Sequence, residues 1–182
     1  TGMDDLEIYL VCPPGLEAAL QQEALDKGFA DPQASSGGVT TRGGWPEVWR
    51  ANLHLRCATR VLVRIGSFMA FHLAQLDKRA RKFPWSEVLR PDVPLQVQVT
   101  SKKSKIYHAG AAAQRIETAL RESHGFTVDP AAALVLKVRI EDNRVTLSVD
   151  TSGEALHKRD HKQAVGKAPL RETMAAAFLR LC

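Results

Sequence analysis

The clearest hydrophobic pattern in the chain lies in residues 95–121. Apolar and polar side chains alternate from Leu95 to Thr100, which is the two-residue period of a strand with one buried face. Apolar residues then recur at intervals of three and four from Ala109 to Leu120, which predicts an amphipathic helix. Three lysines separate the two elements, where the free N–H groups and dipole of a helix start favour anions.

The hydrophobic pattern of residues 6–65 predicts six elements in the order strand, helix, strand, strand, helix, strand. Gly28 is placed to end the first helix, and residues 36–38 form a tight turn between the two middle strands. The last strand is expected at residues 59–65. This order is the split βαβ, or ferredoxin-like, plan.

Beyond this unit, the patterns predict helix, helix, strand, helix, strand, strand, with Pro84 dividing the first helical stretch and residues 141–143 forming a hairpin turn. Residues 152–167 have no sustained apolar period and are predicted as a linker, and an amphipathic helix follows up to residue 182. The sequence therefore predicts an α+β protein of two units whose C-terminal helix packs on a further domain.

Composition excludes several classes of protein. Apolar residues make up 45% of the chain, but no run of 18 or more occurs, so no membrane span is expected. Cys12, Cys57 and Cys182 are isolated from one another, and no Cys/His group has the spacing of a zinc site, so no metal is expected. No charged-then-apolar leader is present, and we therefore expect a cytoplasmic protein.

The net charge of +5 is unevenly distributed. Residues 1–60 hold 5 Lys/Arg against 8 Asp/Glu, whereas residues 61–182 hold 20 against 12. This places any surface that binds polyanions in the second part of the chain. Ten of its cations fall into three clusters, predicted here as phosphate contacts for RNA: Lys78, Arg79, Arg81 and Lys82; Lys102, Lys103 and Lys105; and Lys158, Arg159 and Lys162.

Each of these predictions has a structural alternative. The clusters could be ordinary solvated surface. Tyr107 and His108, beside the lysines of residues 102–105, could stack on an unpaired base, but the ring of Tyr107 could equally cover the core. The other histidines show neither triad order nor metal spacing, so we expect no catalytic residue in the chain.

Four segments resemble a known family: VCPPGLEAALQQEA (11–24), GGVTTRGG (37–44), SKKSKIYHAGAAAQRI (101–116), and LHKRDHK followed by APLRETMAAAFL (156–179). Their order and spacing resemble the N-terminal region of bacterial THUMP-domain RNA methyltransferases, most closely the large-subunit rRNA guanine-N2 methyltransferase family. One departure lies at residues 160–162, where this chain has Asp-His-Lys and the family commonly has Gly-Tyr-Arg.

The resemblance implies three regions. These are an N-terminal ferredoxin-like domain at residues 3–70, a THUMP RNA-binding domain at residues 71–155, for which the family's boundaries start near 44, and a linker and first helix at residues 156–182. The helix would lead into a Rossmann-like catalytic domain that binds S-adenosylmethionine in the parent protein. The family's Gly-rich cofactor loop and Asn/Asp-Pro-Pro-Tyr motif have no counterpart in this sequence. The segment APLRET resembles the one that leads into the catalytic domain, and it implies at most a peripheral contribution to the cofactor site from Pro169, Leu170, Arg171 and Glu172.

The resemblance therefore implies an RNA-binding, substrate-positioning region that serves its own C-terminal methyltransferase domain, with guanine N2 of 23S rRNA as the target. Two alternatives remain open at this stage. The RNA could be a tRNA, since THUMP modules also serve tRNA-modifying enzymes, or the basic residues could belong to a structural or interaction module that binds no RNA.

Overall fold

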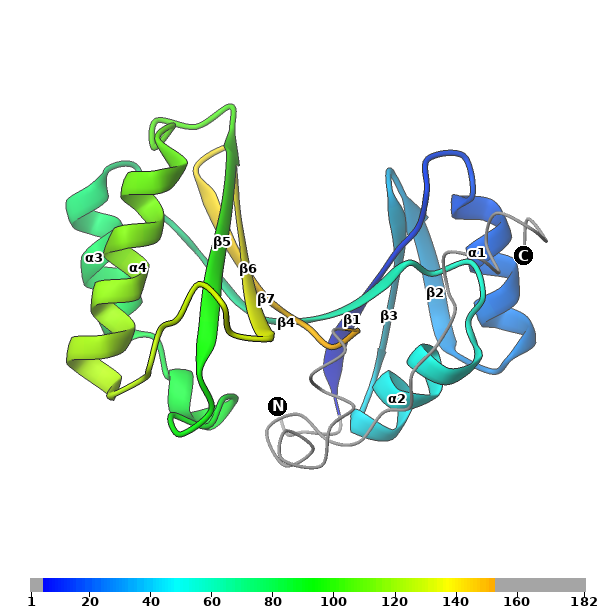
Figure 1. Cartoon of the computed structure of the whole chain (residues 1–182). Helices are drawn as coiled ribbons and strands as arrows, with labels where there is room; N and C mark the ends of the chain where they lie inside the picture. The colour runs from blue at the N-terminus through cyan, green and yellow to red at the C-terminus, as the bar shows by residue number, and fades with distance from the viewer. Residues whose placement is uncertain (1–4, 153–182) are drawn as a thin grey trace. The chain divides into compact units, whose positions relative to one another are not determined.

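The computed structural model describes residues 5–152, which form two compact units. The first comprises residues 5–64 with 150–152, and the second comprises residues 65–149. Both consist of helices packed on a β-sheet (Figure 1). The predicted linker and C-terminal helix, with the candidate residues of 158–172, lie outside the described residues.

The first unit has the predicted βαββαβ order: β1 (Leu6–Val11), α1 (Glu17–Asp26), β2 (Ala30–Ser35), β3 (Gly38–Gly43), α2 (Trp45–His54) and the first part of β4 (Arg60–Met69). The strands lie in the order β2-β3-β1-β4, and neighbouring strands are antiparallel. Gly37 has a φ of +87° in the turn between β2 and β3, a conformation that glycine adopts without strain. The ferredoxin-like prediction is confirmed.

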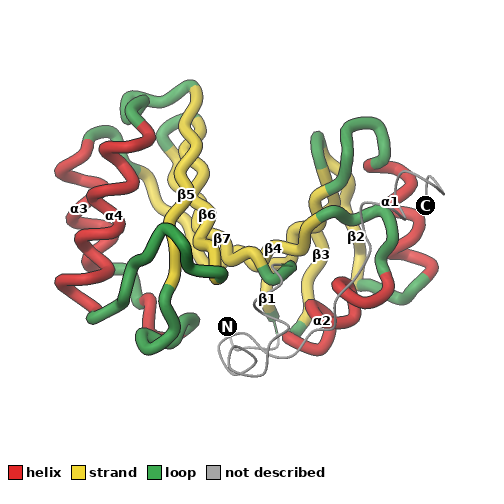
Figure 2. The backbone as a smooth tube through the Cα atoms, in the orientation of Figure 1, coloured by secondary structure: helices red, strands yellow, loops and turns green. Residues whose placement is uncertain are grey.

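The second unit has two helical segments, α3 (Leu73–Lys82) and a single 3-10 turn, η1 (Trp85–Glu87), followed by β5 (Leu95–Lys102), α4 (Ala109–His124), β6 (Leu134–Glu141) and β7 (Arg144–Asp150). The strand order is β4-β7-β6-β5, with β5 parallel to β6. Helices α3 and α4 lie side by side over one face of this sheet (Figure 2). The predicted order of elements is again confirmed, except that the second helix is only one turn long.

The elements follow from local sequence. Asp142 and Asn143 both have positive φ, 52° and 65°, as the two central residues of a type I′ hairpin require, and they join β6 to β7. Ile116 and Leu120 of α4 are fully buried, in agreement with the predicted apolar stripe. Gly125, with a φ of 71°, ends α4 in the left-handed conformation common at helix C-termini.

Strand β4 is longer than predicted. It continues past Ile65 to Met69, and its second part belongs to the second unit, where β7 is its neighbour. Gly66 and the exposed Ser67 interrupt the alternation of apolar residues, so this continuation could not be predicted from the hydrophobic pattern. Ser67 and Phe68 of this extension line a pocket in the second unit.

Across residues 5–152, no helix is both long and apolar enough to cross a membrane.

Candidate nucleic-acid interface

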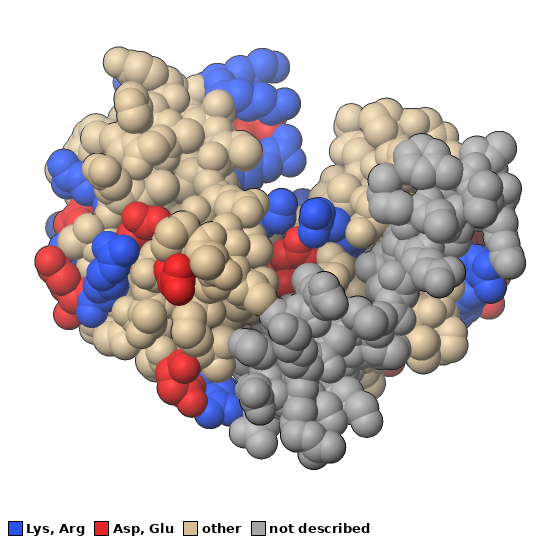
Figure 3. Space-filling view, in the orientation of Figure 1, with Lys and Arg blue, Asp and Glu red and all other residues tan. Residues whose placement is uncertain are grey.

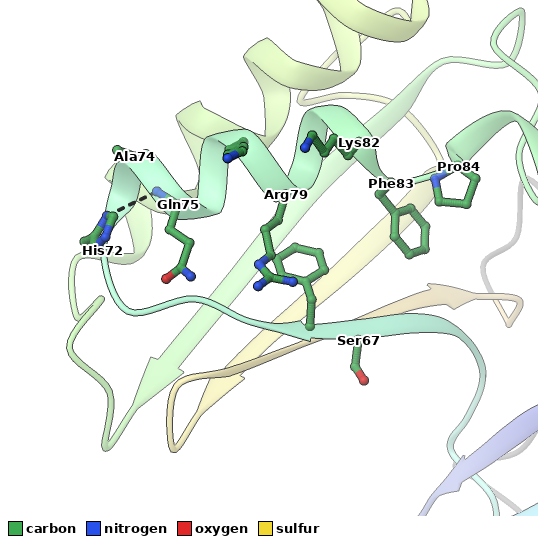
Figure 4. A pocket seen from close by; sticks show the side chains of 10 residues that line it. Ser67, His72, Ala74, Gln75, Arg79, Lys82, Phe83 and Pro84 are labelled. Atoms are coloured by element: carbon green, nitrogen blue, oxygen red, sulfur yellow. Dashed lines mark hydrogen bonds between the residues drawn. The ribbon is translucent and has the colours of Figure 1, made fainter.

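A pocket of about 730 Å³ lies in the second unit between the extension of β4 and helix α3 (Figure 4). Gln75 and Arg79 extend from α3 into this space, and Ser67 lies on the facing strand. The α3 residues that line it include Gln75, Lys78, Arg79 and Lys82, which follow the i, i+3, i+4, i+7 spacing of one helix face. The opposite face of α3 holds the fully buried Leu76 and Ala80.

The start of α3 is fixed by reciprocal hydrogen bonds. His72 is the N-cap residue, and its Nδ1 accepts a hydrogen bond from the backbone N–H of Gln75 at 3.2 Å. The side chain of Gln75 in turn accepts one at 2.8 Å from the N–H of Phe71, the residue before the N-cap, so that it differs from a capping box in its donor by one residue. This arrangement orients the first turn of the helix at one end of the pocket.

The four cations predicted as a cluster on α3 divide into two groups. Arg81 faces α4 and is bonded to Asp77 at 3.0 Å and to Glu122 at 2.9 Å. The hydrogen bonds that Arg81 donates to Glu122 and Asp77 raise the pKa of its guanidinium. No carboxylate of the described residues lies within 4.0 Å of the other three, Lys78, Arg79 and Lys82. The charges that line the pocket are therefore left available for an anion.

Aromatic rings form part of the pocket wall. Phe68 from β4 and Phe83 from the end of α3 both line it and are half-buried, with ring centroids 6.5 Å apart. The ring of Phe83 lies over Gly66, and a Cβ atom added to this glycine would come within 2.4 Å of the ring. On its other contact, the ring centroid of Phe83 lies 4.6 Å from that of the buried Trp85. The pocket thus combines cations with flat apolar surface.

The second cluster of cations lies in the loop from β5 to α4. Lys102 ends β5, Lys103 follows with a φ of 51°, and both are exposed, as is Lys105. Figure 3 shows Lys and Arg side chains gathered around this end of β5, with acidic atoms among them. No ion pair within 4.0 Å joins these three lysines to the carboxylates of residues 5–152.

The hairpin between β6 and β7 holds this loop in place. The Oδ1 of Asn143 accepts from the backbone N–H of Lys105 at 2.9 Å, and the N–H of Asn143 donates to the Oγ of Ser104 at 3.0 Å. The loop is therefore supported by residues about 40 positions later in the sequence. The hydrogen bonds to Asn143 thus hold in place the backbone that carries these lysines.

Tyr107 and His108 follow these lysines in the sequence. Tyr107 has 83% of its surface exposed, so the alternative in which its ring covers the core is wrong. His108 is the N-cap of α4, and its Nδ1 accepts from the N–H of Ala111 at 2.9 Å while its ring remains exposed. A Cβ atom added at the exposed Gly110 would lie 3.2 Å from the Cε1 atom of the His108 ring.

One lysine of the β5–α4 loop lies near the start of α3. The Nζ of Lys105 lies 5.9 Å from the ring centroid of Phe71, which immediately precedes the N-cap of α3. The sequence places these residues 34 positions apart and gave no sign of the contact. The third predicted cluster, Lys158, Arg159 and Lys162, lies outside the described residues.

Several pocket residues were not among the predicted site residues: Ser67, Phe68, His72, Ala74, Gln75, Phe83 and Pro84. The spacing of Gln75 with Lys78, Arg79 and Lys82 was a usable signal for the polar face of α3. The aromatic wall had no such signal, since it depends on the unpredicted extension of β4. No group of three or more His, Cys, Asp or Glu side chains in residues 5–152 is arranged to hold a metal.

The two units match two known domain families. Residues 7–62 match the family described as the RlmL ferredoxin-like domain, and residues 71–150 match the THUMP domain. The fold and the domain order therefore define an α+β chain in which a ferredoxin-like domain precedes a THUMP domain.

Individual relatives align with this chain over almost its whole length. The chain is 31% identical over 92% of its length to a putative RNA methyltransferase of Synechocystis and 30% identical over 95% to ribosomal RNA large subunit methyltransferase K/L of Cellvibrio japonicus. A crystal structure of a predicted N6-adenine-specific DNA methylase from Listeria monocytogenes superimposes with a TM-score of 0.75, at 33% identity over 99% of this chain.

The chain therefore carries an RlmL-type ferredoxin-like domain followed by a THUMP domain, and relatives named ribosomal RNA large subunit methyltransferase K/L match it over most of its length, which confirms the resemblance seen in its four sequence segments. It spans 45% and 24% of the lengths of the two curated relatives and 49% of the Listeria chain.

Proposed function

We propose that this chain is the RNA-binding, substrate-positioning region of an S-adenosylmethionine-dependent RNA methyltransferase that modifies guanine N2 of 23S rRNA. The observation that carries the proposal is the grouping, on α3 and on the loop from β5 to α4, of six cations that each have no carboxylate partner among the described residues: Lys78, Arg79, Lys82, Lys102, Lys103 and Lys105. Two curated relatives named as RNA or ribosomal RNA methyltransferases support the choice of polyanion.

The proposed role is positional. Cations that meet phosphates hold a nucleic acid in register without reading its sequence. Holding the substrate in the correct geometry converts an encounter between molecules into a reaction within one complex, which can supply several kcal/mol of the catalytic effect. The ferredoxin-like unit would support the THUMP unit, and methyl transfer would take place in the catalytic domain of the parent protein.

The cofactor is assigned to that further domain. S-adenosylmethionine supplies the methyl group when bound, but residues 5–152 contain no Gly-x-Gly sequence of the kind found in Rossmann-type cofactor loops. The described residues therefore do not fit the cofactor, and they are proposed to act on the RNA alone.

The proposal is tested by the salt dependence of binding. Fluorescence anisotropy with a labelled RNA hairpin should show affinity falling steeply between about 50 and 200 mM salt, since each neutralised phosphate contributes about 0.7–0.9 to the log–log slope. The triple variant Lys102→Ala, Lys103→Ala, Lys105→Ala should have a slope smaller by roughly 2–3. Its melting temperature should be unchanged because all three side chains are exposed.

A double variant, Arg115→Gln with Arg121→Gln, removes two exposed cations of α4 that lie outside the predicted clusters and serves as the charge control. It should change the slope little. An unchanged slope in the triple variant, or no RNA binding at low salt, would contradict the proposal. Because the Listeria relative is named as a DNA methylase, a DNA hairpin of the same sequence is the comparison ligand, and it should bind less tightly than the RNA.

A further inference from the structure

We infer that the pocket between β4 and α3 holds a single unpaired nucleotide of the bound RNA, with its phosphate on the cations of α3 and its base against the phenylalanine rings. This inference rests on the proposed function, because it takes the nucleotide to be part of an RNA chain. It assigns a different role to this pocket than to the lysines of residues 102–105, which contact phosphates only.

The phosphate part follows from how the cations on α3 are distributed. Arg81 points toward α4, where Asp77 and Glu122 neutralise it. Arg79, together with its neighbours Lys78 and Lys82, lines the pocket with no carboxylate of the described residues within 4.0 Å. A helix face with three uncompensated cations suits a phosphate, and the guanidinium can bind it through two parallel hydrogen bonds.

The base part follows from the aromatic wall. Phe68 and Phe83 are half-buried, so each presents part of its ring to the pocket instead of burying it in the core. Base stacking on such rings is tolerant of sequence because every base has a flat π face. Gly66 allows Phe83 to lie in this position, since a side chain there would collide with the ring.

The pocket also has the dimensions and the rigidity that a nucleotide needs. Its volume of about 730 Å³ falls within the range of roughly 300–1,000 Å³ that small-molecule sites have. Gln75, which extends into it, is fixed by the capping hydrogen bonds at the start of α3. A duplex end cannot enter such a site, because its bases are paired and stacked, so the pocket selects unpaired RNA.

The test compares two labelled RNA hairpins with the same stem, one blunt and one with a short single-stranded tail, at equal salt. The 182-residue chain should bind the tailed hairpin at least about fivefold more tightly, which corresponds to the low end of base–aromatic stacking. The double variant Arg79→Gln with Lys82→Gln should lose this preference while still binding the blunt hairpin. Phe68→Leu, which removes the ring but retains an apolar side chain, should also lose it.

Three controls make the result decisive. Arg115→Gln with Arg121→Gln removes the same number of charges from exposed positions of α4 and should keep the preference for the tail. Thermal unfolding of each variant verifies that the preference is compared between folded proteins. Adenosine 5′-monophosphate, added as a competitor, should reduce binding of the tailed hairpin to the level of the blunt one.

Each contrary result has a separate meaning. A preference for the tail that survives in both pocket variants would overturn the inference but leave the proposed function standing, because the latter is judged by the salt slope. Binding of adenosine monophosphate without any preference for the tail would show a site for a free nucleotide and refute the RNA source. If neither hairpin binds at low salt, both the inference and the proposed function fail.

Discussion

The end of α3 depends on a single indole, and removing its N–H should weaken the second unit measurably. The last backbone hydrogen bond of the helix runs from the N–H of Phe83 to the carbonyl of Arg79 at 3.0 Å. Phe83 then turns to an extended conformation with ψ 136°, as residues before proline tend to do, and Pro84 has no N–H to offer. The carbonyl of Ala80 instead accepts from the Nε1–H of Trp85 at 2.8 Å.

Trp85→Phe would leave that carbonyl without its donor in a fully buried place. An unsatisfied buried acceptor costs about 1–3 kcal/mol. The smaller ring also gives up apolar area equivalent to about two carbon atoms, or about 1–2 kcal/mol. The free energy of unfolding should therefore fall by about 2–5 kcal/mol, which lowers the melting temperature of a unit of this size by roughly 8 °C or more.

The change in the free energy of unfolding is measured by urea titration, with far-ultraviolet circular dichroism as the signal. The matched control is Trp49→Phe, the same chemical replacement at a half-buried indole that stacks on Trp45 at 5.8 Å, where the loss should stay below about 1 kcal/mol. Because Trp85 also supports the ring of Phe83, the Trp85 variant should lose the preference for tailed RNA. A stability within about 0.5 kcal/mol of the parent chain would refute the reasoning.

The elements that the sequence predicted well are those whose stabilisation is local. Helix α4 carries its own apolar stripe, a histidine cap and a terminal glycine within residues 108–125. The hairpin of Asp142 and Asn143 likewise needs only the conformational preferences of its own two residues. Patterns of this kind are visible in one dimension, because the residues that cooperate are neighbours.

The extension of β4 could not be predicted in this way, because it depends on a strand far away in the sequence. Gly66 and Ser67 have neither apolar alternation nor high strand propensity, and they are in a strand because β7 lies beside them. Tertiary pairing therefore decided a local conformation that the local sequence did not favour. Because the extension of β4 was not predicted, the aromatic wall of the pocket was not predicted either.

The charges show the same division. The sequence identified Lys78, Arg79, Arg81 and Lys82 as one basic cluster. The spacing of four residues between Asp77 and Arg81 was a local signal for one ion pair, but the second partner, Glu122, lies 41 positions later on α4 and had no such signal. Helical phase alone gives the direction of each side chain, not what it meets. The structure thus narrows a cluster of four to three cations that are available to a ligand within the described residues.

Two further predictions test single side chains. Tyr107→Ala should leave the melting temperature unchanged because Tyr107 is 83% exposed, but it should weaken binding of RNA with unpaired bases by about 1–3 kcal/mol. Tyr107→Phe keeps the ring and should bind such RNA as tightly as the unchanged chain. An unaltered affinity of the alanine variant would exclude stacking on this residue. For Cys12, burial in the core, with a smaller effect of Glu17, raises the pKa of the thiol from 9.0 to about 11. The folded chain therefore keeps this proton in a pH range where the unfolded chain releases it, so stability should fall as the pH rises above 9 and a Cys12→Ala variant should show a flatter decline. Since the thiolate is the reactive form, alkylation of the Cys12 peptide by iodoacetamide, followed by mass spectrometry, should be much slower in the folded chain than in urea, and equal rates would contradict the raised pKa.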